Sequence, residues 1–210
     1  MEKKGQFLLD AFLPLKNKNL SVYLGGQTVS LLGTMIQGTA MSWVVWEISQ
    51  SPKALGLTNM LNFLPLLIFG AFAGIWADRL DRRKVLLFLQ VGAMLLAFSF
   101  ALLVQTGLIQ VWHIFLLSFL IGCIAAFELP VQLAFLGDVT ETKHISAAVS
   151  LNNLIRQASR TVGPALAGVI IGMFGVSQAF WINGASFLAV IGSLLVVQAH
   201  QVKPTAAQQR

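Results

Sequence analysis

The sequence predicts an all-α membrane protein with six transmembrane helices. Two compositional observations predict this fold class: only 10% of the 210 residues are charged, and 56% are hydrophobic. A soluble domain typically carries about 25% charged residues, so this chain has too few charges to cover a water-facing surface. The few charges are also unevenly spread, and they leave four uncharged stretches, at 20–46, 54–77, 85–127 and 161–199.

These stretches divide into six predicted spans. A membrane helix needs roughly 20 mostly apolar residues to cross about 30 Å of hydrocarbon. The third stretch is too long for one span and is interrupted by Gln105-Thr106-Gly107, and the fourth is interrupted by Gly175-Val176-Ser177-Gln178. All spans should be helical, because an open sheet edge cannot be satisfied in lipid. The expected helices cover 20–46, 54–77, 84–104, 110–136, 147–174 and 179–199.

The basic residues predict the orientation of the chain in the membrane. They precede the first span, cluster at 79–84 between spans two and three, and recur at Lys143, whereas the alternate loops contain only Lys53. Short cytoplasmic loops retain Lys and Arg. We therefore expect a cytoplasmic N-terminal segment at 1–19, a membrane domain at 20–199 and a cytoplasmic tail at 200–210. Because most of the basic residues behind the net charge of +6 lie in these ends and loops, the charge does not indicate a nucleic-acid partner.

Three ionisable residues lie within predicted spans: Glu128, Arg156 and Arg160. A charge at the centre of a membrane helix costs about 2.5–3.5 kcal/mol on insertion scales, so such residues face a partner or a water-filled cavity. Glu128 lies nine residues before Gly137, where span four should end, and Arg156 lies nine residues after Ala147, where span five should begin. The equal depth predicts that Glu128 pairs with Arg156 or, one turn deeper, Arg160. The alternative is that both arginines extend to the cytoplasmic interface.

Uncharged polar residues and a proline also lie within spans. Some of the amides should line a central cavity and offer hydrogen bonds to a substrate, and others should join helices. In span five, Gly163-Pro164 predicts a bend, because Pro164 cannot donate to the carbonyl of Arg160. Gly168 and Gly172 would let a neighbouring helix approach closely. The amide residues are Gln27, Gln37, Asn59, Asn62, Gln132, Asn152 and Asn183.

Neither a metal site nor an enzyme is indicated. One cysteine, Cys123, and three scattered histidines cannot assemble a metal cluster. The sequence contains no H-E-x-x-H zinc motif, no G-x-S-x-G nucleophile elbow and no phosphate-binding loop of an ATPase. No cofactor is expected.

The loop between spans two and three carries a family resemblance. Gly74-Ile-Trp-Ala-Asp78-Arg79-Leu-Asp81-Arg82-Arg83-Lys84 resembles the signature loop of the major facilitator superfamily: a Gly, an Asp-Arg pair four residues later, then a basic cluster. In that family the loop latches two six-helix halves together on the cytoplasmic side, which implies this role for Asp78, Arg79 and Arg82. Asp81 stands where the family most often has Gly, and since Asp tolerates left-handed backbone, the turn is expected to form.

The resemblance extends over roughly residues 20 to 200 and is closest to the drug- and siderophore-exporter branch, which includes macrolide-type and enterobactin-type exporters. It rests on Ser30-Leu-Leu-Gly33-Thr34, Ser51-Pro52-Lys-Ala-Leu-Gly56, Phe127-Glu128-Leu-Pro130-Val-Gln132 and Arg160-Thr-Val-Gly163-Pro164. Many members place an Asp where this chain has Thr34. The resemblance implies the N-terminal bundle of the family fold, built as two three-helix repeats, in the inner membrane of a bacterium.

The function implied by the resemblance is efflux of small molecules by alternating access, driven by protons. The expected partners are a small-molecule substrate, protons, the lipid bilayer and a second six-helix bundle or a second copy. A truncated gene, an excised fragment and a half-transporter all fit a chain with one bundle. A membrane subunit or scaffold without transport of its own is the alternative. The substrate cannot be identified from the sequence.

Overall fold

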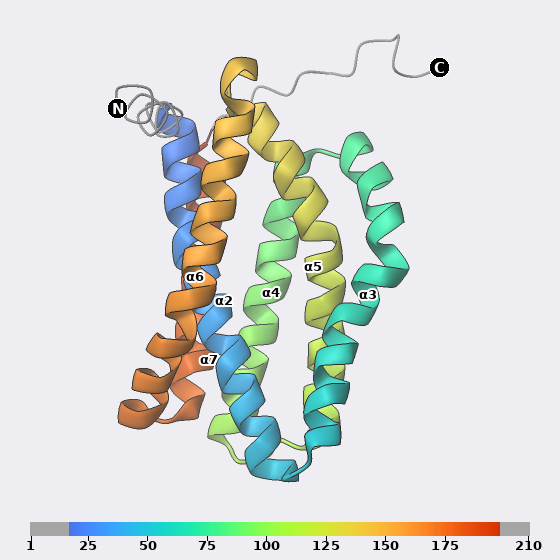
Figure 1. Ribbon diagram of the computed structural model, residues 1–210, viewed down its shortest axis with the longest axis vertical. Coiled ribbons are helices and arrows are strands. Elements are labelled where there is room, and N and C mark those ends of the chain that lie inside the picture. The colour runs from blue at the N-terminus through green and yellow to red at the C-terminus, as the bar shows by residue number, and fades with distance from the viewer. Residues whose placement is uncertain (1–16, 198–210) are drawn as a thin grey trace, which may run out of the picture.

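The computed structural model describes residues 17–197, except for the side chains of residues 71, 73 and 75–79. Over this part of the chain it contains six long helices joined by short loops (Figure 1). Their ends differ from the predicted spans by at most three residues, which confirms the all-helical fold. The helices are α2 (Lys18–Ser49), α3 (Pro52–Arg79), α4 (Arg82–Gln105), α5 (Val111–Val139), α6 (Ile145–Phe174) and α7 (Val176–Val196), with a short 3-10 helix, η2 (Thr142–His144), before α6.

Local signals in the sequence account for the helix ends. The side chain of Asn17 caps α2 by accepting hydrogen bonds from the backbone N–H groups of Asn19 and Leu20, at 3.0 and 3.4 Å. At the other end of α2, Gln50 adopts the left-handed conformation (φ 47°) that commonly ends a helix. Pro52 then occupies the first position of α3, where a missing N–H costs nothing.

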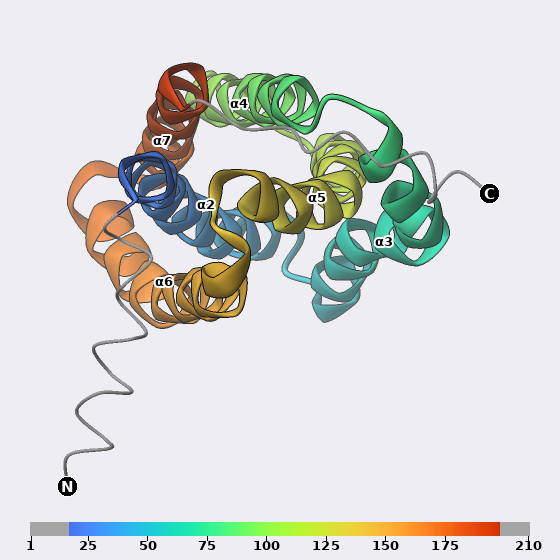
Figure 2. The same ribbon diagram turned by 90° about the horizontal axis from the view of Figure 1, so that it is seen from above.

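The six helices form a bundle with α2 and α5 at its centre (Figure 2). α2 packs against α7 and α6, α5 packs against α3 and α4, and α4 also packs against α7. Figure 2, which looks down the bundle, shows α3 on one flank and α6 on the other. Two apolar clusters fill the interior. One gathers near the ends that hold Leu20 and Leu194, and the other gathers near the opposite ends, around Val45 and Phe180.

Four of the described helices are long and apolar enough to cross a membrane: the segment Pro52–Gly70 of α3, and α4, α5 and α7. α2 and α6 have 32 and 30 residues, so their length suffices, but their composition is more polar. α6 alone carries Asn152, Arg156 and Arg160. The polar groups that lower the hydropathy of these two helices are largely those predicted to have an interior role.

Glycines allow the closest helix contacts. A Cβ added at Gly26 would lie 2.6 Å from the carbonyl oxygen of Ala189, where α2 meets α7. A Cβ at Gly163 would meet the Cβ of Met35, where α6 meets α2. In lipid, association of helices depends on such close packing, since there is no hydrophobic drive between them.

α6 runs unbroken through Pro164, and the predicted bend there remains a prediction. Gly168 and Gly172 lie in open space: an added Cβ at either would have no neighbour within 4 Å. The helix that these two glycines were expected to admit is therefore absent from the described part of the chain.

Substitution of Gly163 by alanine tests the packing of α6 on α2. Gly163→Ala should destabilise the bundle by about 1–3 kcal/mol, the usual cost of overpacking, because its methyl group would collide with Met35. Gly168→Ala is the matched control and should be neutral or slightly stabilising, since alanine favours helix over glycine and the site is open. Thermal unfolding of the purified chain in detergent measures both. Equal melting temperatures for the two variants would contradict the packing.

Candidate functional site

The centre of the bundle contains a carboxylate held by amide side chains. Glu128 of α5 is partly buried, and its Oε1 accepts a hydrogen bond from Nε2 of Gln90 in α4 at 3.0 Å. Gln27 of α2 lies beside this carboxylate. Gln27 and Gln90 are almost completely buried, at 1% and 2% exposed. Three helices therefore contribute side chains to one acidic group.

Arg156 of α6 joins the same cluster through Gln132. Its Nη2 donates to Oε1 of Gln132 at 2.7 Å, and Tyr23 of α2 lies beside Gln132. Gln132 lies four residues after Glu128, on the same face of α5. The ring of Tyr23 packs edge-on against Phe135, with centroids 5.1 Å apart.

The predicted depth relation between the acid and the arginine agrees with the structure, but the direct ion pair does not form. Glu128 lies eleven residues before the end of α5 at Val139, and Arg156 lies eleven residues after the start of α6 at Ile145, about 16 Å along each helix. The positive charge of Arg156 acts on Glu128, yet its guanidinium bonds Gln132. The prediction of a direct contact was wrong, because the guanidinium of Arg156 takes the amide oxygen of Gln132 as its partner.

Arg160, the alternative partner, is not part of the cluster. Its side chain is exposed on the surface of α6, and among the described residues it has no ion-pair or hydrogen-bond partner. It lies one turn beyond Arg156 along α6.

Several buried polar atoms around Glu128 have no hydrogen-bond partner within residues 17–197. Buried polar groups are nearly always paired in folded proteins, so a group of unpaired atoms marks a place that can accept new bonds. Asn152, one turn before Arg156, is fully buried with both side-chain atoms unpaired. The other unpaired atoms near the cluster are Gln27 Oε1, Gln90 Oε1, Gln132 Nε2 and Arg156 Nε.

The remaining predicted polar residues either join two helices or bond the backbone of their own helix. Nδ2 of Asn183 in α7 donates to Oε1 of Gln37 in α2 at 2.7 Å, in a buried contact. Asn62 of α3 donates to the carbonyl of Ser118 in α5 at 3.3 Å. Asn59 is exposed and bonds the carbonyl of Leu55, one turn back in the same helix. A substrate-facing role for these residues remains a prediction.

The basic loop between α3 and α4 ties helix ends together. Arg82 forms an ion pair with Asp138 at the end of α5, with Nη1 2.6 Å from Oδ1. Arg83 donates to the carbonyl oxygens of Leu194 and Leu195 at the end of α7, both at 2.5 Å. Cations are favourable at that position, because the carbonyl end of a helix carries partial negative charge. Arg82 and Arg83 thus both contact residues of this six-helix bundle.

The backbone at Asp81 differs from the expected left-handed turn. Its φ and ψ are −65° and 101°, which is extended, and its side chain caps α4 by accepting from the N–H of Lys84 at 3.2 Å. Aspartate is among the best helix N-caps, which explains how it replaces glycine here. Gly74 lies within α3 with open space beside it. The side chains of Asp78 and Arg79 lie outside the described residues, so their role as a latch remains a prediction.

Three residues of these networks were missed by sequence reasoning: Tyr23, Gln90 and Asp138. Gln90 is a polar residue in the middle of an uncharged span, the same signal that selected Gln27. Asp138 follows the end of span four on the side where the basic residues gather, so its charge was a usable signal. Within the described residues, no group of three His, Cys, Asp or Glu side chains could hold a metal ion.

Comparison with known proteins gives a consistent result over nearly the whole chain. A sequence profile described as transmembrane secretion effector, within the major facilitator superfamily, matches residues 9–210. The chain is 30% identical over 176 residues to the MFS-type transporter YfiS of Bacillus subtilis, covering 83% of this chain and 41% of that protein.

Two further relatives have printed functions. The chain is 27% identical over 162 residues to the staphyloferrin A transporter of Staphylococcus aureus, covering 76% of this chain and 41% of the relative. It is 25% identical over 175 residues to macrolide efflux protein A of Streptococcus pyogenes, covering 81% and 42%. The chain thus spans about two fifths of the length of the curated relatives that it matches.

Removal of the Asp138 charge tests the network of helix ends. The side chains of Arg82 and Asp138 are only 24% and 6% exposed, so Asp138→Asn should lower the free energy of unfolding by about 1–3 kcal/mol. Glu141→Gln is the matched control. Its hydrogen bond and ion pair with Lys143, which lower the pKa of Glu141, lie on the exposed surface, where such pairs contribute little to stability. Equal losses in urea or thermal unfolding would contradict a structural role for Asp138.

Proposed function

Because the chain belongs to the transmembrane secretion effector family of the major facilitator superfamily, we propose that it exports small amphipathic molecules in exchange for protons, with Glu128 as the proton-binding group. The observation that carries this proposal is the position of Glu128. Among the described side chains it is the one acid in the middle of a helix, and it is surrounded by buried amides from α2, α4 and α5. Intramembrane acids in such a setting are typical of proton relays.

The amides around Glu128 suit both of its protonation states. As a carboxylate, Glu128 accepts a hydrogen bond from Gln90, and Gln27 lies beside it. As a carboxylic acid it also has an O–H to donate. The unpaired Oε1 atoms of the same two glutamines can accept that bond once either amide rotates. Uptake of a proton therefore exchanges bonds between helices without leaving the new donor unsatisfied.

The arginine links this exchange to α6. When Glu128 is neutral, Arg156 loses the negative charge that acts on it, and its bond to Gln132 becomes its main contact in the cluster. The relative stability of two arrangements of α5 and α6 then depends on a proton. This is the physical requirement for coupling, since a ligand shifts an equilibrium only through different affinities for the two states.

The proposal places the chain as one bundle of a two-bundle transporter in a bacterial inner membrane, with six spans and both ends in the cytoplasm. The pattern of helix contacts supports the two three-helix repeats. If α2 corresponds to α5, α3 to α6 and α4 to α7, the α2–α7 contact has the α5–α4 contact as its counterpart. The α3–α5 contact likewise has the α6–α2 contact as its counterpart, and all four contacts occur. The open glycines of α6 supply a surface for the second bundle. A scaffold without transport of its own is the alternative.

Transport by membrane vesicles tests the function. Inverted vesicles from cells that express the chain should accumulate a radiolabelled macrolide when an inward-acidic pH gradient is imposed, and Glu128→Gln should reduce the gradient-dependent part at least tenfold. Glu47→Gln is the matched control, since Glu47 is exposed near the far end of α2, and it should transport normally.

Two outcomes would count against the proposal. Full gradient-dependent uptake by Glu128→Gln would remove this residue from the coupling. Absence of gradient-dependent uptake by the wild-type chain, in vesicles where immunoblotting shows it inserted, would contradict export by this chain.

A further inference from the structure

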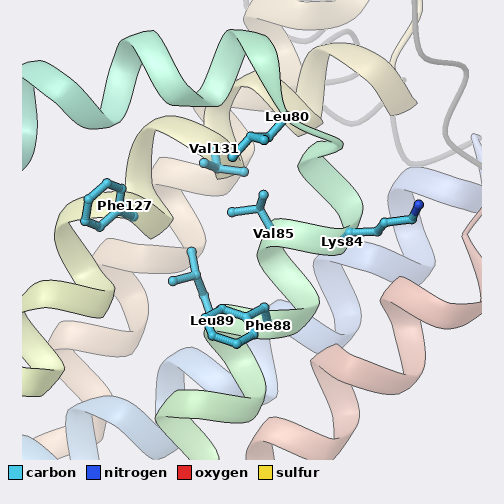
Figure 3. Close-up of a pocket in the computed structure, with 7 residues that line it drawn as sticks. All are labelled: Leu80, Lys84, Val85, Phe88, Leu89, Phe127 and Val131. Carbon is cyan, nitrogen blue, oxygen red and sulfur yellow. The ribbon is translucent and has the colours of Figure 1, made fainter.

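A groove of about 380 Å³ lies apart from the Glu128 cluster, between the α3–α4 connection, the first turns of α4 and the middle of α5 (Figure 3). This volume falls within the usual range of ligand sites, about 300–1,000 Å³. The walls are apolar with one exception, a lysine. The lining residues are Leu80, Lys84, Val85, Phe88, Leu89, Phe127 and Val131.

The groove is open to the outside of the bundle. Phe88, on its α4 wall, is 79% exposed, and Leu80 is 47% exposed. Leu89 and Val131 form deeper parts of the lining and belong to the buried interior. An apolar channel with one exposed wall suits an occupant that is itself apolar and lies along the helix. A polar solute would find no hydrogen-bond partner among the six apolar lining residues.

Positive charge gathers at one end of this groove. Lys84 lies in the first turn of α4, and its ammonium points away from the apolar walls (Figure 3). Its one ion-pair partner in the described residues is Asp81, at 3.5 Å, and the lysine side chain is 81% exposed. Such a loose surface pair is readily exchanged for another anion. Arg82 and Arg83 lie beside it, so the residues 81–84 carry three positive charges against one negative.

The distance from the charge to the deepest lining residue suits a lipid. From Lys84 to Leu89 the groove follows α4 for five residues, about 7.5 Å along the helix. A charged end at the interface with an apolar channel leading towards the bilayer centre is the shape of an anionic phospholipid with one acyl chain in the channel. Anionic lipids are attracted to basic residues beside a membrane span.

We propose that this groove binds an anionic phospholipid, with its phosphate at Lys84 and an acyl chain between Phe88, Leu89 and Phe127. The bound lipid fills the space between the start of α4 and the end of α3 and supports the Arg82–Asp138 and Arg83–α7 contacts beside it. The site rests on the proposed membrane placement but does not depend on Glu128 or on transport.

Lipid titration of the purified chain, followed by native mass spectrometry, tests the site. Palmitoyl-oleoyl phosphatidylglycerol should bind more tightly than phosphatidylcholine with the same chains. Lys84→Ala should weaken binding of phosphatidylglycerol about fivefold, the effect expected for one lysine near a membrane surface, and should leave phosphatidylcholine unchanged. Lys53→Ala is the matched control, an exposed lysine at the opposite end of the bundle, and should leave both affinities unchanged.

A second variant reports on the channel itself. Val85→Phe places a larger side chain in the groove and should weaken both lipids, with its fold checked by its melting temperature in detergent. Equal affinity for the two lipids in the wild-type chain, or unchanged phosphatidylglycerol affinity in Lys84→Ala, would overturn the proposal. Glu128→Gln should bind phosphatidylglycerol normally, so failure of the transport proposal leaves this result interpretable.

Discussion

The need to satisfy a carboxylate inside a membrane bundle shapes the centre of this protein. A charge at that depth is expensive, by about 2.5–3.5 kcal/mol on insertion scales, and Glu128 meets the cost through contacts from several helices. Gln90 bonds it directly, Gln27 lies beside it, and Arg156, which bonds Gln132, supplies opposite charge. Because the partners come from α2, α4, α5 and α6, these helices must keep one register relative to each other, and the two apolar clusters lie on either side of this level.

A second set of polar contacts fixes the helix ends near the basic loop. Asn17 joins the start of α2 to the carbonyl of Val139, Arg82 joins the start of α4 to Asp138, and Arg83 joins it to the end of α7. The end of α5 is therefore held by two neighbours, eleven residues away from Glu128. Glu128 therefore lies on a helix whose end is anchored, whereas α3 and α6 form the flanks of the bundle (Figure 2). This division between an anchored interior and peripheral helices suits a transporter that rocks about a central site.

Much of the fold could be predicted from the sequence, because charges and polar breaks mark the ends of every helix. The depth of Glu128 and Arg156 was predictable for the same reason, since it follows from helix length alone. Their partners were not predictable. The choice between a direct ion pair and a hydrogen bond from Arg156 to Gln132 depends on how α4 and α5 are rotated, and no local sequence pattern indicates that rotation. Asp81 was misjudged through its family position, whereas its capping ability explains its backbone. Arg160 differs from Arg156 by one turn, and only the packing of α6 decides which of the two enters the cluster.

Infrared difference spectroscopy of the chain in lipid tests most directly whether Glu128 binds and releases a proton inside this amide cluster. Spectra taken at alkaline and acidic pH should contain a protonated-carboxyl band, together with shifts in glutamine amide bands as Gln27 and Gln90 exchange their bonds. The account predicts that Glu128→Gln removes this band and the accompanying amide shifts, while Glu47→Gln retains both. An unchanged carboxyl band in Glu128→Gln, or a band without any amide shift in the wild-type chain, would contradict the central role given to this residue.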